Sequence, residues 1–226
     1  ETMGGSDLGN YNITAQGTTT ADITAKAITI SGITASNKVY DSTTSATLDV
    51  DSIAGFIAGD DVSISAITGT FADEHVDTDI AVSFSNITYA GSDKDNYTIT
   101  DQAGTTADIT QKDLTVSGIT ASNKVYDSTT SATVDDGSVV FTGLVEGDDL
   151  TISTTGVFNN EHVGTQTVTL TETMGGSDLG NYNITAQGTT TANITAKALT
   201  IGGITAANKT YDGDASATID VSAATF

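Results

Sequence analysis

The chain has 226 residues, of which 29 are acidic and 7 are basic, so its formal net charge at neutral pH is −22. This charge disfavours nucleic acid as a partner, because phosphates are bound by clusters of Lys and Arg. The sequence contains no cysteine, which excludes disulfides, cysteine-based zinc sites and thiol nucleophiles, and it has no apolar run near the roughly 20 residues that a membrane-spanning helix needs.

Apolar residues alternate with polar ones in short stretches separated by Gly, Asp, Asn and Ser, which is the pattern of strands and turns. In chain order through one copy of the repeat described below, the stretches lie at 28–30, 46–50, 62–66, 80–84, 97–99 and 107–109. Ile53, Phe56 and Ile57 break the alternation with spacings of three and four, which fit a short helix or an irregular loop. With 37% hydrophobic residues and many Thr, the chain is predicted to be all-β and to form small modules.

Three blocks of sequence recur along the chain, so it is built from a repeat. The block with Asn-Lys-Val-Tyr-Asp occurs three times, at 33–47, 119–133 and, more loosely, 204–218. The block with Gly-Ser-Asp and Asn-Tyr also occurs three times, at 5–14, 91–100 and 176–185, and both blocks have offsets of 86 and then 85 residues. A third block, from Gly-Asp-Asp to Glu-His-Val, occurs at 59–76 and 147–163. Its offset drifts from 88 to 87, which predicts length differences in loops.

The phase of the alternation marks the module boundaries, because a strand that keeps one face buried also keeps one phase. Apolar residues are odd-numbered up to Ala25 and even-numbered from Ile28, and the phase changes again at 112–113 and at 197–198. The predicted organisation is the closing part of one module in 1–26, complete modules in 27–112 and 113–197, and the opening part of another module in 198–226. The joints carry no Gly or Ser run, so short extended links that restrict bending are expected.

The motifs follow one order: Tyr-Asp with Thr-Thr-Ser-Ala-Thr, then Gly-Asp-Asp, then Phe-x-x-Glu-His-Val, then Gly-Ser-Asp-x-x-Asn-Tyr-x-Ile-Thr. This series, which covers essentially the whole chain, resembles the YDG domains of very large bacterial surface proteins. The resemblance implies a repeated β module in an adhesin-like or fibre-forming exoprotein. We expect tandem small β-sandwich-like modules, or β-grasp-like ones, in an elongated array. The chain departs from the family pattern in two places. The glycine of the Tyr-Asp-Gly motif is kept in the third copy as Gly213 but is replaced by Ser42 and Ser128 in the first and second copies, and Asp77 stands in the first copy where the second copy has Gly164, which fits the pattern.

The ordinary pKa of a histidine side chain lies near neutral pH, so an acid–base catalytic mechanism would have to involve His75 or His162. Each follows a Glu, but no second His accompanies either one, and the chain contains neither Gly-x-Ser-x-Gly nor His-Glu-x-x-His. Both histidines are interpreted as turn residues between two strands. No catalytic residue is predicted, and the chain is not expected to be an enzyme.

Calcium is the ligand that an acidic chain most readily suggests, since clustered carboxylate and carbonyl oxygens bind it. The candidate ligands are the repeated pairs Asp60-Asp61 and Asp148-Asp149. Asp95 adds a carboxylate in another acidic motif, but its counterparts are Gly9 and Gly180. The alternative, which the sequence favours, is that these motifs are β-turns in which Asp and Asn cap the backbone. In that case no cofactor is required.

Repeated tyrosines and lysines allow two further roles. Aromatic platforms for a glycan are conceivable at the tyrosines, which are Tyr11, Tyr40, Tyr97, Tyr126, Tyr182 and Tyr211. Their recurrence at the same positions in every copy favours packing instead, with each hydroxyl bound to one partner. The repeated Lys38, Lys124 and Lys209 leave open an isopeptide crosslink to Asn or Asp.

The expected function is structural, as the repeat region of an extracellular bacterial adhesin or surface filament that acts as an acidic, extended stalk or fibre. Its partners would be neighbouring modules or identical chains in a filament, and the net charge would keep stalks apart. The alternative is a repetitive binding module for calcium or a glycan that acts through avidity. The expected location is the cell surface or the medium, and any secretion signal would lie outside these residues.

Overall fold

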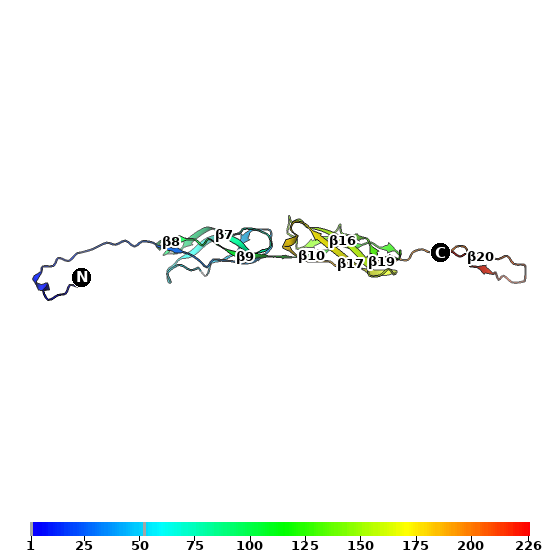
Figure 1. The fold of residues 1–226 in the computed structure, drawn as a ribbon, viewed down its shortest axis with the longest axis horizontal. Helices are drawn as coiled ribbons and strands as arrows, with labels where there is room; N and C mark the ends of the chain where they lie inside the picture. Colours follow the sequence, from blue (N-terminus) through cyan, green and yellow to red (C-terminus); the bar gives the residue numbers. More distant parts are fainter. Residues whose placement is uncertain (1, 52) are drawn as a thin grey trace. The chain divides into compact units, whose positions relative to one another are not determined.

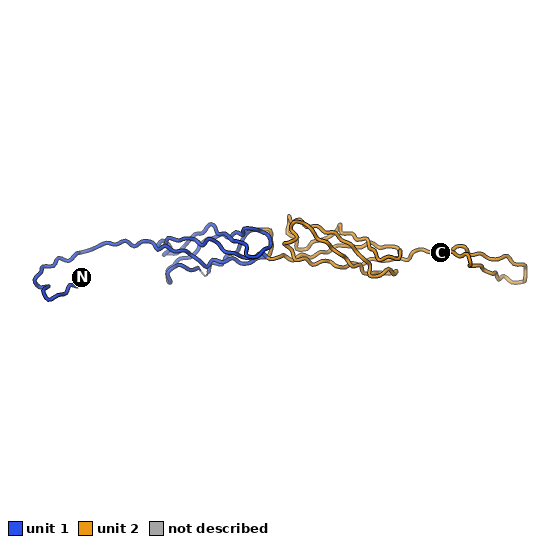
Figure 2. The backbone as a smooth tube through the Cα atoms, in the orientation of Figure 1, with its two compact units in different colours: residues 1–38, 43–109 blue, residues 39–42, 110–226 orange. Residues whose placement is uncertain are grey.

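The computed structural model describes residues 2–51 and 53–226, and the chain is all-β, with 46% strand and 4% helix (Figure 1). It divides into two compact units, of which the first comprises residues 1–38 and 43–109 and the second comprises residues 39–42 and 110–226 (Figure 2). The sheets form two tandem, half-barrel-like modules. The prediction of an all-β chain of tandem modules is therefore confirmed.

The first unit is built around a long antiparallel hairpin of β6 (Ser63–Phe71) and β7 (Asp77–Ala90), and β9 (Gly104–Thr110) pairs with the other side of β7. Two-residue strands complete a five-stranded sheet in the order β3-β9-β7-β6-β4, with β3 at Lys38–Val39 and β4 at Ser45–Ala46. Two smaller sheets accompany it. In one, β1 (Lys26–Thr29) runs parallel to β8 (Tyr97–Thr100), and in the other, β2 (Thr34–Ala35) runs antiparallel to β5 (Leu48–Asp49).

The second unit repeats this plan with a five-stranded sheet in the order β12-β19-β17-β16-β13. These strands are β12 (Lys124–Val125), β13 (Ser131–Ala132), β16 (Thr151–Phe158), β17 (Gly164–Gly175) and β19 (Thr189–Thr195). In a smaller sheet, β10 (Lys112–Ser117) lies between β15 (Val140–Thr142) and β18 (Tyr182–Thr185), antiparallel to the former and parallel to the latter. The strands β11 (Thr120–Ala121) and β14 (Val134–Asp135) form an antiparallel pair.

Short elements complete the described residues. Single-turn 3-10 helices directly precede the tyrosine of each Asn-Tyr motif, at η1 (Leu8–Asn10), η2 (Lys94–Asn96) and η3 (Leu179–Asn181). In residues 198–226, β20 (Thr205–Ala206) pairs with β21 (Ile219–Asp220), and Tyr211 is 93% exposed. Among residues 2–51 and 53–226, no helix has the length and apolar character needed to cross a bilayer.

Alternating burial along the strands forms the core of each unit. In the second unit, Val168 and Leu170 of β17 and Ala192 and Ile194 of β19 are buried, whereas the residues between them are exposed. These side chains belong to one hydrophobic cluster with Phe158 of β16. Fully burying an aliphatic or aromatic side chain contributes roughly 1.5–3 kcal/mol, so the period-two pattern of the sequence directly supplies the stability of the sheet.

The segment with helical spacings is irregular in the first unit. Ala54 forms an antiparallel bridge with Ser31, Phe56 lies in a bend, and the Ile57 carbonyl accepts a hydrogen bond from the Asp60 amide, while residue 52 lies outside the described residues. In the second unit, Val140 and Phe141 of the corresponding segment belong to the strand β15, which pairs with β10, whereas Leu144 and Val145 lie outside it. The helical alternative is wrong because the backbone of Ala54 and of β15 bonds to a neighbouring segment.

The length differences between the two copies lie inside strands. β16 and β17 pair continuously, whereas the register of β6 against β7 shifts on both sides of Ala66. A β-bulge inserts an extra residue into one strand of a pair and leaves the adjoining turn unchanged. The prediction that the drifting offset reflects loops is therefore wrong.

The predicted joints lie at the ends of strands. Lys26 and Lys112 are the first residues of β1 and β10, and residues 197–198 follow β19. A single residue, Gln111, stands between β9 and β10. Its side-chain amide donates a hydrogen bond to the carbonyl oxygen of Gly180 at 3.0 Å, so this residue is itself held in place.

Candidate functional site

In the second unit, the Gly-Asp-Asp turn and the Asn-Tyr motif meet in a cluster of Asp148 and Tyr182. Tyr182 follows η3 as the first residue of β18, and its ring is 3% exposed. Its hydroxyl donates to Asp148 Oδ2 at 2.5 Å and accepts from the Val145 amide at 2.9 Å. Burial, followed by the hydrogen bond to Asp148, raises the pKa of Tyr182 to about 12. Tyr182 thus remains a neutral donor to a carboxylate at physiological pH.

A second tyrosine joins this cluster from the segment 39–42, which belongs to the same compact unit. The Tyr40 hydroxyl donates to Asp148 Oδ1 at 3.3 Å, and its ring lies edge-to-face against Tyr182, with centroids 5.7 Å apart. The Tyr40 amide donates to the carbonyl of Thr110 at 2.9 Å, and the residue is 2% exposed. Burial, and then the bond to Asp148, raises the pKa of Tyr40.

The first unit contains the corresponding pair. The Tyr97 hydroxyl donates to Asp60 Oδ2 and accepts from the Ile57 amide at 3.0 Å. The ring of Phe56 packs edge-to-face on Tyr97 with centroids 5.3 Å apart. The bond to Asp60, and then burial, raises the pKa of Tyr97. One carboxylate oxygen and one tyrosine are therefore joined in the same way in both copies of the repeat.

The other predicted calcium ligands serve the turns. The Asp61 carboxylate accepts from the Ser92 amide at 3.0 Å, and the Asp61 amide donates to Asp93 at 2.9 Å. In the second copy, the Asp149 amide donates to Asp178 at 2.8 Å. Among the described residues, no group of three or more His, Cys, Asp or Glu side chains could hold a metal ion. These contacts are of the kind that the turn interpretation predicts.

We expect calcium to leave the melting temperature of the chain unchanged. The carboxylates of Asp60, Asp61 and Asp148 already accept hydrogen bonds from tyrosine or serine. A metal that binds only the folded state at a hundred times its dissociation constant would add about 2.7 kcal/mol, which a thermal melt resolves readily. Melts with excess calcium and with chelator test this expectation, and magnesium is the matched control. A rise specific to calcium would assign these aspartates as ligands.

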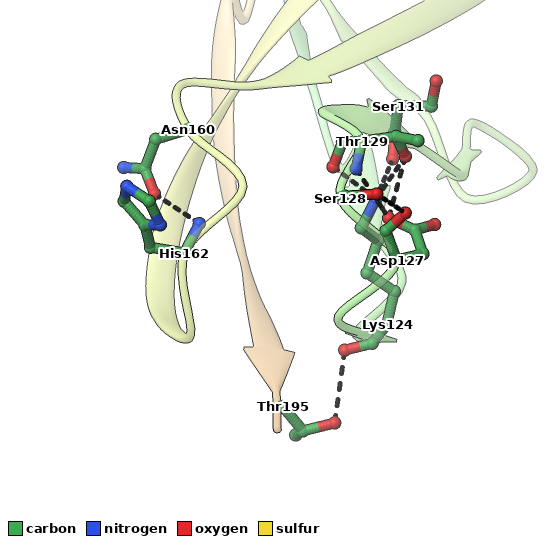
Figure 3. Close-up of polar contacts among 8 residues, drawn as sticks. All are labelled: Lys124, Asp127, Ser128, Thr129, Ser131, Asn160, His162 and Thr195. Atoms are coloured by element: carbon green, nitrogen blue, oxygen red, sulfur yellow. Dashed lines mark hydrogen bonds and ion pairs between the residues drawn. The ribbon is translucent and has the colours of Figure 1, made fainter. Parts of the chain in front are cut away.

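The Tyr-Asp motif forms a lysine-centred loop in each copy, drawn for the second unit in Figure 3. Lys124 Nζ donates to the Thr129 carbonyl at 2.8 Å and to the Ser131 carbonyl at 3.2 Å, and it pairs with Asp127 at 2.8 Å. Nζ also lies 5.5 Å from the centroid of the Phe158 ring. Lys38 makes the same contacts with Thr43, Ser45 and Phe71 in the first copy. The lysine therefore closes the loop with hydrogen bonds to its backbone.

The serines that replace glycine in this loop have left-handed backbones. Ser42 has φ of 56° and Ser128 has φ of 60°, while Gly213 has φ of 88°. Glycine adopts this region at no steric cost, whereas other L-residues are strained there. The Ser128 hydroxyl donates to the Asp127 carbonyl at 2.6 Å, so a local hydrogen bond accompanies the strained residue. The departure from the family pattern thus changes the residue and keeps the turn.

We expect the pKa of Asp127 to be about 2, because Lys124 and then Thr129 stabilise its charged form. Since the folded value lies below the ordinary one, the charge contributes stability above the ordinary pKa, and that contribution is lost as the pH falls through about 2. A carboxyl-detected NMR titration measures the pKa, and Lys124→Met should raise it toward the ordinary value. Asp214, whose pKa Lys209 and Ser216 lower to about 2, should be unchanged in that variant. An unaltered Asp127 in Lys124→Met would contradict the assignment.

Both histidines lie in the turn of the long hairpin, as the sequence predicted. The His75 amide donates to Asp73 Oδ1 at 3.0 Å, and its ring Nδ1 lies 2.6 Å from the same oxygen. The His162 amide donates to Asn160 Oδ1 at 2.8 Å (Figure 3). In both copies, the side chain two residues before the histidine caps its backbone amide. The pKa of Asp73 is lowered, mainly by the hydrogen bond from the His75 amide.

The tyrosines divide into buried and exposed groups. Tyr97 and Tyr182 are 8% and 3% exposed, and each hydroxyl bonds to an aspartate, so the packing interpretation holds for them. Tyr11 and Tyr211, in the terminal segments, are 72% and 93% exposed. Sequence reasoning missed the meeting of Tyr40 with Asp148, which are 108 residues apart. The local pattern contains no signal for this contact.

Comparison with known families identifies the repeat. A family model described as the YDG domain matches residues 24–106 and 110–192. These two matches together span well over half of the chain. Searches of curated proteins and of solved structures returned no significant match.

Proposed function

Because the chain belongs to the YDG domain family, we propose that it is a structural repeat region of an extracellular bacterial adhesin or surface filament. In this role it acts as an acidic stalk or fibre and performs no catalysis. Length is then set by the number of modules, as in other arrays of stacked repeats. Neighbouring modules, or identical chains in a filament, are its partners.

The single observation that carries the proposal is the direct succession of the modules. Only Gln111 stands between β9 and β10, and its side chain is bonded to the Gly180 carbonyl. A flexible linker would need several Gly or Ser residues without such contacts. A one-residue link suits a protein that has to hold a distance, because an array of such modules contains no long linker.

Two further properties support a spacer. In both copies the loop lysine donates to the backbone of the Tyr-Asp loop, and a tyrosine donates to the first aspartate of Gly-Asp-Asp, whereas a binding head usually differentiates one site. The net charge of −22 makes like chains repel one another and remain solvated. The calcium melts described above separate this function from that of a calcium-binding module.

Small-angle X-ray scattering of the whole chain tests the proposal. Inserting a six-residue Gly-Ser linker after Gln111 should lower the radius of gyration, although it lengthens the chain, because the two units can then approach each other. The matched control is the same insertion at Gly137, which lies in an exposed turn within the second unit. Equal radii for the wild type and the Gln111 insertion would mean that the native link is already flexible, and the stalk proposal would fail.

A further inference from the structure

In the second unit, Tyr40 occupies a site in which Asp148 and Tyr182 belong to repeated blocks of the sequence. The Asp148 carboxylate accepts a hydrogen bond from the Tyr40 hydroxyl, and the Thr110 carbonyl accepts one from the Tyr40 amide. The ring of Tyr182 packs against the ring of Tyr40. Each of the two carboxylate oxygens of Asp148 therefore accepts a hydrogen bond from a different tyrosine. We call these three residues, Asp148, Tyr182 and Thr110, the filled tyrosine site.

The first unit contains the same three residues around a pocket. Asp60, Tyr97 and Thr24 correspond to Asp148, Tyr182 and Thr110 in the repeat, and all three line a pocket of about 390 Å³. For comparison, a cavity of about 150 Å³ is large enough to hold benzene. Asp60 Oδ2 is bonded to Tyr97, as Asp148 Oδ2 is bonded to Tyr182. The pocket therefore lies where Tyr40 lies in the second unit.

The surroundings, and not the sequence, determine whether this tyrosine is buried. Residues 33–47 and 119–133 are identical, and the Tyr126 amide donates to the Thr195 carbonyl at 2.8 Å, as the Tyr40 amide does to Thr110. Tyr40 is nevertheless 2% exposed, whereas Tyr126 is only partly buried. The difference is that Tyr40 lies against an Asp–Tyr pair.

We propose that the pocket beside Asp60 and Tyr97 is a docking site for the tyrosine of a Tyr-Asp segment from another copy of the repeat, joined in tandem before residue 27. The hydroxyl of that tyrosine donates to Asp60 Oδ1, and its ring packs edge-to-face on Tyr97. This inference rests on the proposed function, because it requires the array of repeat copies that the stalk consists of.

A tandem copy is favoured over a free chain as the source for two reasons. Residues 5–14 match 91–100, so the residues that lead into β1 are the closing part of a repeat copy. In the same way, β9 closes one copy and leads into β10 of the next. One ring and one hydrogen bond also form a small contact, which becomes effective when tethering raises the local concentration to the millimolar range. Separate chains that carry a net charge of −22 also repel each other, so a contact this small is not expected to hold them together without tethering.

The first test uses the 226-residue chain and N-acetyl-tyrosinamide at millimolar concentrations, followed by amide NMR. Shifts are expected at Ile57, Asp60 and Tyr97 and not at Val145, Asp148 and Tyr182, because Tyr40 fills the second site. Tyr40→Ala should add the second set of shifts. Asp60→Asn should weaken binding at the first site about fivefold, because a carboxylate accepts a stronger hydrogen bond than an amide. Asp77→Gly, which lies outside the pocket lining and has Gly164 as its counterpart, should bind like the wild type.

Absence of shifts at the first site in the wild-type chain overturns the proposal, and this arm needs no variant to fold. Should Tyr40→Ala fail to fold, Tyr40→Ser provides the same opening of the second site. Binding of N-acetyl-phenylalaninamide with equal affinity would also overturn it, because that probe lacks the hydroxyl.

The second test identifies the source of the tyrosine. In a chain whose residues 1–26 are replaced by a further copy of residues 27–112, the added tyrosine should fill the pocket, and the probe should no longer shift Ile57 and Asp60. Continued probe binding overturns the tandem assignment, as would concentration-dependent dimers of the original chain in sedimentation. The scattering experiment on the Gln111 insertion is independent of both tests, so failure of the docking site and failure of the stalk function give different results.

Discussion

Replacing Gly176 by alanine is expected to destabilise the second unit by about 3 kcal/mol or more. Gly176 has φ of 112°, and a Cβ atom at this position would lie 2.0 Å from the carbonyl oxygen of Asp149. That atom belongs to the backbone of the Gly-Asp-Asp turn, so it cannot rotate away as a side chain could. Alanine would therefore have to break the contact between this turn and the Asn-Tyr motif, which also positions Tyr182 against Asp148.

Gly180 provides the matched control in the same loop. Nothing lies within 4 Å of a Cβ built on Gly180, and the corresponding position of the first copy is Asp95. Gly180→Ala should therefore change stability by less than about 0.5 kcal/mol. Thermal unfolding followed through the amide signals of β17 reports the second unit alone. Equal melting of the two variants would show that the loop relaxes around a side chain and would contradict the close approach.

Replacing Phe158 by alanine is expected to cost about 3–5 kcal/mol in the second unit. Its ring is 2% exposed and packs in the hydrophobic cluster with Val168 and Ile194. Lys124 lies over the same ring while its Nζ closes the Tyr-Asp loop. Loss of the ring thus removes core contacts and also the surface on which the lysine rests, so the loop around Asp127 should lose amide protection.

Val157, the neighbour of Phe158 on β16, is the control because its side chain points to the other face and is 53% exposed. Val157→Ala should change stability by no more than about 0.5 kcal/mol. Urea unfolding monitored by the amides of β17 measures both variants, and Phe71→Ala tests the same position in the first unit. A small effect of Phe158→Ala would mean that the cluster is not the principal core of the second unit.

Local features of the fold could be predicted from the sequence alone. Alternation such as that of Ile80, Val82 and Phe84 predicts strands because side chains on opposite faces of a strand meet opposite environments. The strand β7 contains all three residues, and β6, β8 and β9 also overlap predicted stretches. The histidine turns and the acidic turns were predictable in the same way, because Asp and Asn cap backbone groups only two residues away.

Pairing, by contrast, depended on the tertiary structure. The parallel pairs of β1 with β8 and of β10 with β18 join residues about 70 positions apart, and nothing in either strand specifies its partner. The bulges around Ala66 and the strand β15 also follow from how neighbouring strands satisfy the backbone. The same holds for Asp148, whose two tyrosines come from segments distant in sequence. Periodicity records which face of a strand is buried, whereas the identity of the group that buries it is decided by contacts across the whole fold.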